Sequence, residues 1–269
     1  MVIPVHDINP VRRVPWLTYG LIAANIIVFL RTPAAASLGI EDLSLADLCR
    51  QEAFYRQYGA IPQEMLTNEQ LSAVPTGQTG TGPSGPGCVV APPTYEKFPA
   101  LSVFNSMFLH AGWLHLLGNM LFLAVFGNNI EDRMGRLQYL LFYLLSGYVA
   151  AYGFALSTPD ATVPLIGASG AVSGVLGAYL VLYPWARVWS LVPILLFLPL
   201  KLPAWLVLGM WFALQWIYAT GYAVSEAGSV AYLAHVLGFA VGVVVAIPLR
   251  IWQSRPKPPP SPIQYRRIR

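Results

Sequence analysis

The stretch LIGASGAVSGVLGAYLVLY, Leu165 to Tyr183, decides the fold. It is long and apolar enough to cross a bilayer, which requires about 17–25 such residues. Its first third consists almost entirely of Gly, Ala and Ser. Because small residues let another helix approach closely, the stretch predicts a membrane helix that carries a serine, Ser169, on a tightly packed face.

The composition of the whole chain is typical of a membrane protein. Of its 269 residues, 56% are hydrophobic and only 10% are charged, and the mean hydropathy is +0.56. Soluble domains carry about 25% charged residues. We therefore expect an all-α polytopic membrane protein. In such a protein the net charge of +4 reports orientation, and we expect no nucleic-acid partner.

Six stretches are long enough to span the bilayer and predict a six-helix bundle. They are Val14–Leu30, Met107–Gly127, Leu137–Leu156, Leu165–Tyr183, Pro203–Gly221 and Val230–Leu249. A seventh apolar stretch, Val188–Leu200, has only 13 residues and contains two prolines. We expect a re-entrant or interfacial segment there.

Basic residues predict the orientation. Residues 250–269 include six basic and no acidic side chains, and Arg12 and Arg13 precede the first span. Since basic segments stay in the cytoplasm, both ends are expected there, which requires an even number of spans. The expected organisation is a cytoplasmic tail (1–13), a six-span domain (14–249) with an external loop (31–106), and a basic, Pro-rich cytoplasmic tail (250–269). A bacterial plasma membrane is the simplest location, and a cleaved signal peptide is the alternative to the first span.

The external loop contains the two cysteines of the chain, Cys49 and Cys88. Its first part, residues 40–66, is charged and helix-like. The stretch PTGQTGTGPSGPG, residues 75–87, predicts a flexible segment because it is rich in Gly, Pro, Ser and Thr. In an oxidising space the cysteines are expected to form a disulfide, with two free thiols as the alternative.

Polar side chains in the apolar helices indicate a functional site, because such residues are costly in a membrane. His110 and His115 belong to the second expected span and His235 to the sixth. Asn119 follows His115 by one helical turn and therefore shares its face. His6, in the N-terminal segment, is expected to be solvated.

Ser169 and His235 are expected at the same depth. Each lies about five or six residues into its span, which places both roughly 6–9 Å below the outer surface at about 1.5 Å per residue. Gly238 and Gly242 give the sixth span a surface that can dock against the small residues around Ser169. No Asp or Glu occurs between Ala161 and Ser225. We expect a Ser–His dyad whose histidine is oriented by helix packing, and helix packing without catalysis is the alternative.

These residues resemble the rhomboid family of intramembrane serine proteases, over most of Met107–Leu249. The matching residues are His110, His115 and Asn119 for H-x-x-x-x-H-x-x-x-N; Gly167, Ala168, Ser169 and Gly170 for G-x-S-G; Ala234, His235, Gly238, Phe239 and Gly242 for A-H-x-x-G-F-x-x-x-G; and Gly127, Glu131 and Gly135 for G-x-x-x-E-x-x-x-G.

The resemblance implies an endopeptidase that cleaves transmembrane protein substrates in or near their membrane segments, within the lipid bilayer and without cofactor or metal. Ser169 would be the nucleophile and His235 the general base and acid, through an acyl-enzyme. His115, Asn119 and the Ser169 backbone N–H would stabilise the oxyanion. Supporting residues would be His110, Gly167, Gly170, Gly238, Gly242 and Glu131.

Two positions depart from the family's pattern. Many members carry a Trp-Arg pair where this chain has Leu101 and Ser102, and some carry a Tyr that stacks on the histidine where it has Ser173. An inactive rhomboid-like protein that binds or escorts membrane clients is the alternative function. A transporter and a zinc protease are disfavoured, because the chain has neither an inverted repeat nor an H-E-x-x-H motif.

A shallow dyad also needs access for water and substrate. We expect a polar cavity open to the outside, capped by residues 222–230 and by the segment before His110. The substrate is expected to enter beside the fifth span, where Trp211, Phe212 and Trp216 would form an apolar gate. The alternative is that these aromatic side chains simply face lipid.

Overall fold

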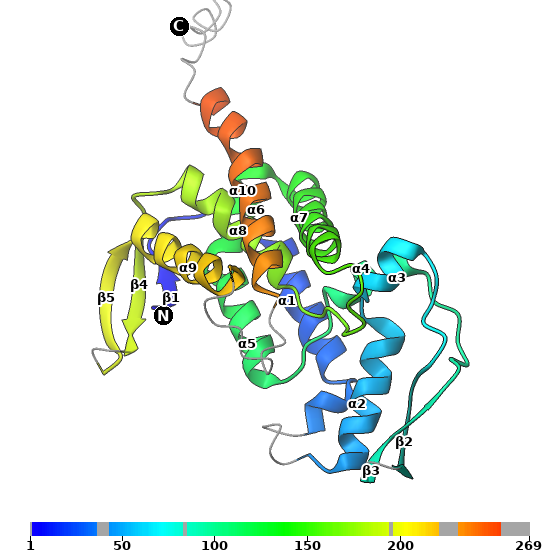
Figure 1. The fold of residues 1–269 in the computed structure, drawn as a ribbon. Helices are drawn as coiled ribbons and strands as arrows, with labels where there is room; N and C mark the ends of the chain where they lie inside the picture. Colours follow the sequence, from blue (N-terminus) through cyan, green and yellow to red (C-terminus); the bar gives the residue numbers. More distant parts are fainter. Residues whose placement is uncertain (1, 37–42, 83–84, 194–195, 221–230, 254–269) are drawn as a thin grey trace, which may run out of the picture.

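The computed structural model describes residues 2–36, 43–82, 85–193, 196–220 and 231–253. Most of these residues are helical, and the helices gather into one bundle with a smaller outer region at one end (Figure 1). The bundle helices are α1 (Trp16–Phe29), α5 (Trp113–Phe122), α6 (Asn128–Met134), α7 (Arg136–Ser157), α8 (Ser169–Leu182), α9 (Ala204–Ala219) and α10 (Tyr232–Gln253).

Each of the six expected spans coincides with an apolar helix. Among the described residues, three continuous helical segments are long and apolar enough to cross a membrane: Trp113–Met134, Arg136–Ser157 and Tyr232–Trp252. The helices α1, α8 and α9 are apolar but shorter. The number of six crossings therefore stays a prediction.

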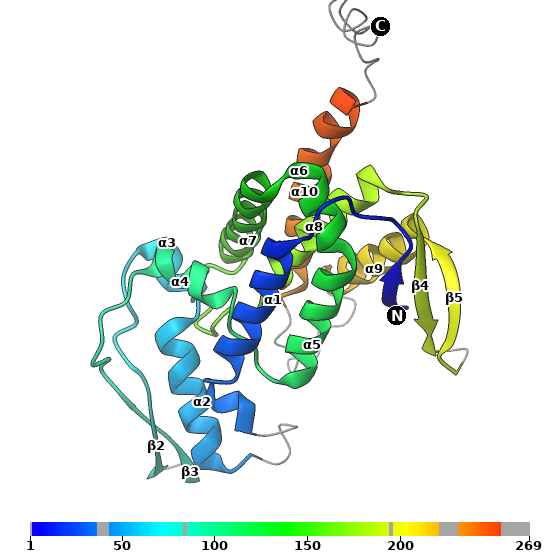
Figure 2. The same cartoon turned by 180° about the vertical axis from the view of Figure 1, so that it is seen from behind.

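The second expected span is displaced along the chain. Its helix begins at Trp113 rather than Met107, and it continues through a π-helical turn, Leu123–Gly127, into α6. The predicted end at Gly127 is therefore wrong. The continuation places Glu131 at the N-terminus of α1, where its carboxylate accepts the backbone N–H groups of Leu17 at 3.1 Å and Thr18 at 2.7 Å. Figure 2 shows α1 and α5 side by side.

The fold is not all-α, because two small sheets flank the helices. Residues expected to form a re-entrant or interfacial segment form a hairpin of β4 (Arg187–Val192) and β5 (Leu198–Pro203). β4 also pairs with β1 (Ile3–Asp7), so the sheet order is β1-β4-β5. The stretch is too short to cross a bilayer as a helix, and its backbone groups are satisfied instead by antiparallel pairing.

Asp7 attaches this sheet to the bundle. Its buried carboxylate accepts hydrogen bonds from the Tyr179 hydroxyl at 2.6 Å and from the Asn129 amide at 2.7 Å. Part of the segment expected as an N-terminal tail is thus a strand that packs beside α5 and the π-helical turn, and Asp7 links it to α8. Nothing in the sequence of residues 1–13 alone reveals that the partner strand lies beyond residue 186.

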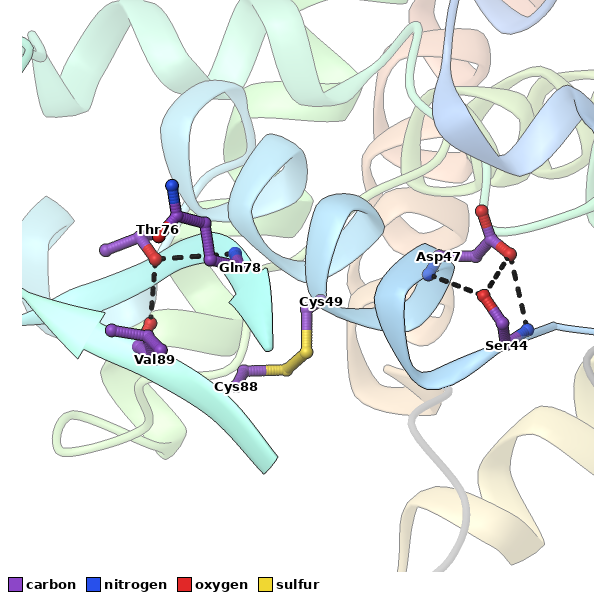
Figure 3. The surroundings of a disulfide bond; sticks show 7 residues. All are labelled: Ser44, Asp47, Cys49, Thr76, Gln78, Cys88 and Val89. Carbon is purple, nitrogen blue, oxygen red and sulfur yellow. Dashed lines mark hydrogen bonds between the residues drawn. A yellow bond between two sulfur atoms is a disulfide. The ribbon is translucent and has the colours of Figure 1, made fainter. Parts of the chain in front are cut away.

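The outer region contains α2 (Leu45–Tyr58), α3 (Pro62–Thr67), β2 (Val74–Gly82), β3 (Gly85–Ala91) and α4 (Pro99–Ser106). The flexible segment expected at 75–87 is wrong for the described residues, because β2 and β3 pair as an antiparallel hairpin. Figure 3 shows that this hairpin is joined to α2 by a disulfide between Cys49 and Cys88, whose Cα atoms lie 5.3 Å apart. The hairpin thus packs on α2 instead of extending into solvent.

The helices α8 and α10 form the tightest seam of the bundle (Figure 1). A methyl group on Gly242 would overlap the carbonyl oxygen of Gly174, and one on Gly238 would overlap that of Gly170. A methyl group on Gly177 would overlap the carbonyl oxygen of Phe239. The two backbones therefore touch, as the small residues of α8 predict.

Candidate active site

The structure brings Ser169 and His235 into hydrogen-bond contact. Ser169 Oγ lies 2.8 Å from His235 Nε2, and both side chains are partly buried. Ser169 is the first residue of α8 and His235 the fourth residue of α10. The glycine seam between these two helices therefore sets the distance between the two groups.

Ser169 lies at a helix start rather than five residues inside one. Gly167 has a φ of +121°, a conformation that favours glycine and that ends any helix running from Leu165. The sequence-based depth of 6–9 Å counted from Leu165 and so does not apply. The consequence is chemical, because the first N–H groups of a helix have no intrahelical partner and point at any group near Ser169.

Gly167 also keeps space open beside the serine. A Cβ atom on this residue would lie 2.7 Å from His115 Nε2 and 3.6 Å from Ser169 Oγ. The missing side chain leaves room between these two atoms for a small group such as a carbonyl oxygen. His115 Nδ1 accepts the Ala111 N–H at 3.4 Å, which leaves Nε2 as the donor nitrogen that faces this space.

Asn119 lies one turn after His115 on α5, as expected. Its side-chain nitrogen donates to the His115 carbonyl oxygen at 2.9 Å, and the residue is buried. In this position one amide hydrogen is engaged with the helix itself, and the other is free to serve a bound group.

His110 precedes α5 instead of lying within a span. It is fully buried, and its ring meets that of His115 edge-on at a centroid distance of 4.9 Å. Its carbonyl oxygen accepts the hydroxyl of Tyr55, from α2, at 2.7 Å. Burial raises the pKa of the Tyr55 phenol, so this hydroxyl stays a donor. The outer region thus fixes the backbone just before His115.

A second contact joins the outer region to the residues before Ser169. Leu165 donates its N–H to the Ala60 carbonyl oxygen at 2.6 Å, and Gly167 donates its N–H to the Ser106 carbonyl oxygen at 2.8 Å. The chain that leads to the serine is therefore held from both α2–α3 and α4.

Sequence reasoning missed Gln215. Its Oε1 lies 2.7 Å from His235 Nδ1, and the residue is buried on α9. The expected orientation of His235 by helix packing, without an acid, is thus supplemented by a hydrogen bond with an amide side chain. A signal was present, because Gln215 is the only amide or charged residue in an otherwise apolar and aromatic helix, and such residues are functional candidates in membrane helices.

The aromatic residues expected at a gate divide between two environments. Trp211 is buried, and its ring lies 6.1 Å from that of His235. Trp216 is 53% exposed, and its ring centroid lies 6.4 Å from that of Phe212. The expected cap at 222–230 lies outside the described residues.

The positions that depart from the family's pattern have local roles. Ser173 Oγ donates to the Ser169 carbonyl oxygen at 2.6 Å, and Ser102 Oγ donates to the Pro99 carbonyl oxygen at 2.7 Å. Leu101 is exposed on α4. The ring of Tyr232 approaches His235 edge-on at 6.2 Å, so Trp211 and Tyr232 flank the imidazole in place of a stacked Tyr at Ser173.

The remaining supporting residues have structural positions. Gly170, Gly238 and Gly242 belong to the α8–α10 seam, and a Cβ on Gly170 would also meet Ala150 of α7 at 2.7 Å. Glu131 lies at the opposite end of the bundle, where α1 begins. Two surface hollows of about 340 and 300 Å³ are at that end as well, and they are lined by residues such as Trp16 and Arg136. A cavity at Ser169 stays a prediction. Within the described ranges, no group of three His, Cys, Asp or Glu side chains could hold a metal ion.

Comparison with known proteins gives a consistent result. A family model described as Rhomboid domain matches residues 98–252. RHOMBOID-like protein 6, mitochondrial, of Arabidopsis thaliana is 28% identical over 61% of this chain and 50% of its own length. Rhomboid protein 1, mitochondrial, of Saccharomyces cerevisiae is 34% identical over 54% of this chain and 40% of its own length.

A third relative is Rhomboid-like protease 3 of Toxoplasma gondii, 34% identical over 32% of this chain and 32% of its own length. The chain spans about half the length of the first curated relatives that it matches. The matched residues 98–252 contain Ser169, His235, His115 and Asn119, and they cover more than half of the chain. The chain belongs to the rhomboid family.

Proposed function

We propose that the protein is an intramembrane serine endopeptidase that cleaves peptide bonds in or near the transmembrane segments of other proteins. The observation that carries the proposal is the 2.8 Å contact between Ser169 Oγ and His235 Nε2. A serine hydroxyl becomes a useful nucleophile when an adjacent base can take its proton. Family membership supports the same reaction class, because rhomboid proteins are generally serine proteases.

In the proposed reaction, Ser169 Oγ attacks the carbonyl carbon of the scissile peptide bond while His235 Nε2 takes the hydroxyl proton. The C–N bond then breaks, and His235 gives that proton to the leaving amine. Water attacks the resulting acyl-enzyme with His235 again as base, which releases the acid product and restores Ser169. No metal or cofactor is required by this scheme.

The negative charge on the carbonyl oxygen would develop in the space left by Gly167. His115 Nε2 and Ser169 Oγ border that space, the Ser169 backbone N–H is the first of α8, and Asn119 lies one turn after His115 on α5. Hydrogen-bond donors aimed at a developing oxyanion contribute about 10²–10³ in rate each. We assign His115 and the Ser169 N–H as the principal donors and Asn119 as a further one.

The proposed setting is a cell membrane crossed six times, with both described ends of the chain in the cytoplasm and Ser169 near the outer side. The basic residues that precede α1 and those in residues 250–269 support this orientation. The outer region would then lie outside, where a disulfide persists. The proposed partners are transmembrane protein substrates and the surrounding lipid.

The proposal is tested by cleavage of a single-span substrate protein in liposomes. Ser169→Ala and His235→Ala are each expected to abolish cleavage, and the double variant should be no worse than either single one because the residues act as a unit. His115→Ala should lower kcat by about 10²–10³, and Asn119→Ala should lower it by less. Wild-type cleavage by Ser169→Ala would contradict the proposal. Client binding without cleavage by the wild-type chain would favour an inactive escort instead.

A further inference from the structure

We propose that Gln215 is a positioning residue for His235, a neutral third member that holds the imidazole in the tautomer and orientation needed to take the Ser169 proton. The inference rests on the proposed function, since it concerns the same dyad. It also makes a statement about hydrogen bonding that is measurable without proteolysis.

The two ring nitrogens of His235 face different partners. His235 Nδ1 lies 2.7 Å from Gln215 Oε1, and Nε2 lies 2.8 Å from Ser169 Oγ. A neutral imidazole has one donor and one acceptor nitrogen, and an amide oxygen can only accept. The hydrogen therefore sits on Nδ1, and the lone pair of Nε2 faces the serine hydroxyl. A general base must present that lone pair.

The reverse arrangement would be unproductive. If the Gln215 amide nitrogen faced Nδ1, it would donate, and the ring hydrogen would move to Nε2. Ser169 would then receive a hydrogen bond in place of giving up its proton. The orientation of one amide group on α9 thus decides whether the dyad can begin the reaction.

The surroundings explain why an amide suits this position. The helices packed against α10 are α7, α8 and α9, and none of the three carries an Asp or Glu. A carboxylate within a membrane helix is costly to insert. A buried amide is neutral, and it accepts the Nδ1–H without that cost.

Neighbouring rings hold the amide and the imidazole together. Trp211, one turn before Gln215, has its ring 6.1 Å from that of His235, and Tyr232 meets the imidazole edge-on at 6.2 Å. Tyr232 stacks in turn on Tyr218 of α9 at 4.9 Å. Within the part of the chain that the structure describes, the titratable groups near His235 are His115 from α5 and the phenol of Tyr232.

The first test compares three variants of α9 in the cleavage assay. Gln215→Met keeps the length of the side chain and removes the acceptor, so kcat is expected to fall roughly 10- to 100-fold with little change in KM. Gln215→Glu keeps an acceptor oxygen and should recover most of kcat. Its carboxylate favours a protonated His235, so the acid limb of the kcat profile should move to higher pH. Leu208→Met, buried two turns earlier on the same face, is the control and should leave kcat unchanged.

The second test measures the tautomer directly. Nitrogen-15 histidine spectra of the wild-type protein and of His235→Ala, recorded in detergent at neutral pH, isolate the His235 signals by difference. We expect a protonated Nδ1 and a bare Nε2 in the wild type, and a mixture of both tautomers in Gln215→Met.

A protonated Nε2 in the wild type, or wild-type kcat in Gln215→Met, would overturn the assignment. Failure of the proposed function has a different signature. A chain that shows the fixed Nδ1–H tautomer but cleaves no substrate would contradict the protease proposal and still support the role of Gln215.

Discussion

The bundle and the outer region are each stabilised by a different kind of interaction. The α8–α10 seam relies on glycines that let two backbones touch. The outer region relies on a disulfide, a buried ion pair between Glu64 and Lys97, and a capping box at the start of α2. Lipid gives helices no hydrophobic reason to associate, so close approach must supply the stability. A small region in water has too small a hydrophobic core to be stable by packing alone, and here covalent and ionic links add stability.

The difference predicts that the largest effects of single substitutions on the outer region come from its ion pair. Lys97 Nζ lies 2.7 Å from Glu64 Oε2, and these side chains are 4% and 1% exposed. Lys97→Met leaves a buried carboxylate unpaired, which costs about 3–5 kcal/mol of unfolding free energy. Arg50→Met is the matched control, because the Arg50–Asp47 pair is exposed and such pairs contribute about 0–1 kcal/mol. Pulse proteolysis of the outer region in urea measures the unfolding free energy of both variants. Equal decreases in Lys97→Met and Arg50→Met would contradict the comparison.

The same pair predicts a pH dependence. Burial lowers the pKa of Lys97 from its ordinary value of 10.5, although the ion pair with Glu64 opposes the shift. Between the lowered value and 10.5 the unfolded chain binds more protons than the folded one, so the unfolding free energy of this region should rise with pH across that window. This increase of the unfolding free energy with pH should be weaker in Lys97→Met. An unchanged increase in that variant would show that another group is responsible for it.

The disulfide should have the next largest effect. Replacing both cysteines with serine removes a link between residues 39 positions apart, which is expected to cost about 2–4 kcal/mol of unfolding free energy in the outer region. The thermal unfolding of the bundle should stay within a few degrees of the wild type. A bundle that melts together with the outer region would show that the two regions form one cooperative unit.

The cap of α2 should have a smaller effect on the outer region. Ser44→Ala, which removes this cap, should lower the unfolding free energy by only about 1 kcal/mol.

The seam of the bundle gives a third contrast, between two glycines. A methyl group on Gly242 would overlap the Gly174 carbonyl oxygen, whereas a methyl group on Gly209 would meet no atom within 4 Å outside its own stretch of helix. Gly242→Ala should destabilise the bundle by about 1–3 kcal/mol and shift Ser169 from His235. Gly209→Ala should be neutral or stabilise α9 by up to about 1 kcal/mol. Melting temperatures in detergent test this, and equal values for the two variants would contradict a seam of touching backbones.

The smallest effect concerns the outer face of α9, which has no such seam. Trp216 is exposed, so Trp216→Ala should leave the melting temperature unchanged. If it gates entry, cleavage of a transmembrane substrate should become a few-fold faster, while labelling by a small probe stays constant. Trp211→Ala should behave differently, because this side chain is buried beside His235. If Trp216→Ala slows both substrate cleavage and probe labelling, Trp216 is a structural support and not a gate.

The sequence alone predicts the apolar helices, the partnership of Ser169 with His235, and the pairing of α8 with α10. These features depend on composition and on short spacings, such as the glycines that follow His235. The β1–β4 pairing is different, because its hydrogen bonds join residues 3–7 to residues 188–191 and leave no local pattern. Gln215 was missed for a related reason, since its role depends on α9 lying beside α10. The exact start of α8 depended on the backbone of one residue, Gly167.

The most direct test of the Ser169–His235 dyad is the reaction of the purified protein with a fluorophosphonate probe, followed by mapping of the labelled residue by mass spectrometry. We expect one labelled site, Ser169, and loss of the label in His235→Ala although that variant still carries the serine. Labelling of another residue, or undiminished labelling of Ser169 in His235→Ala, would contradict the account.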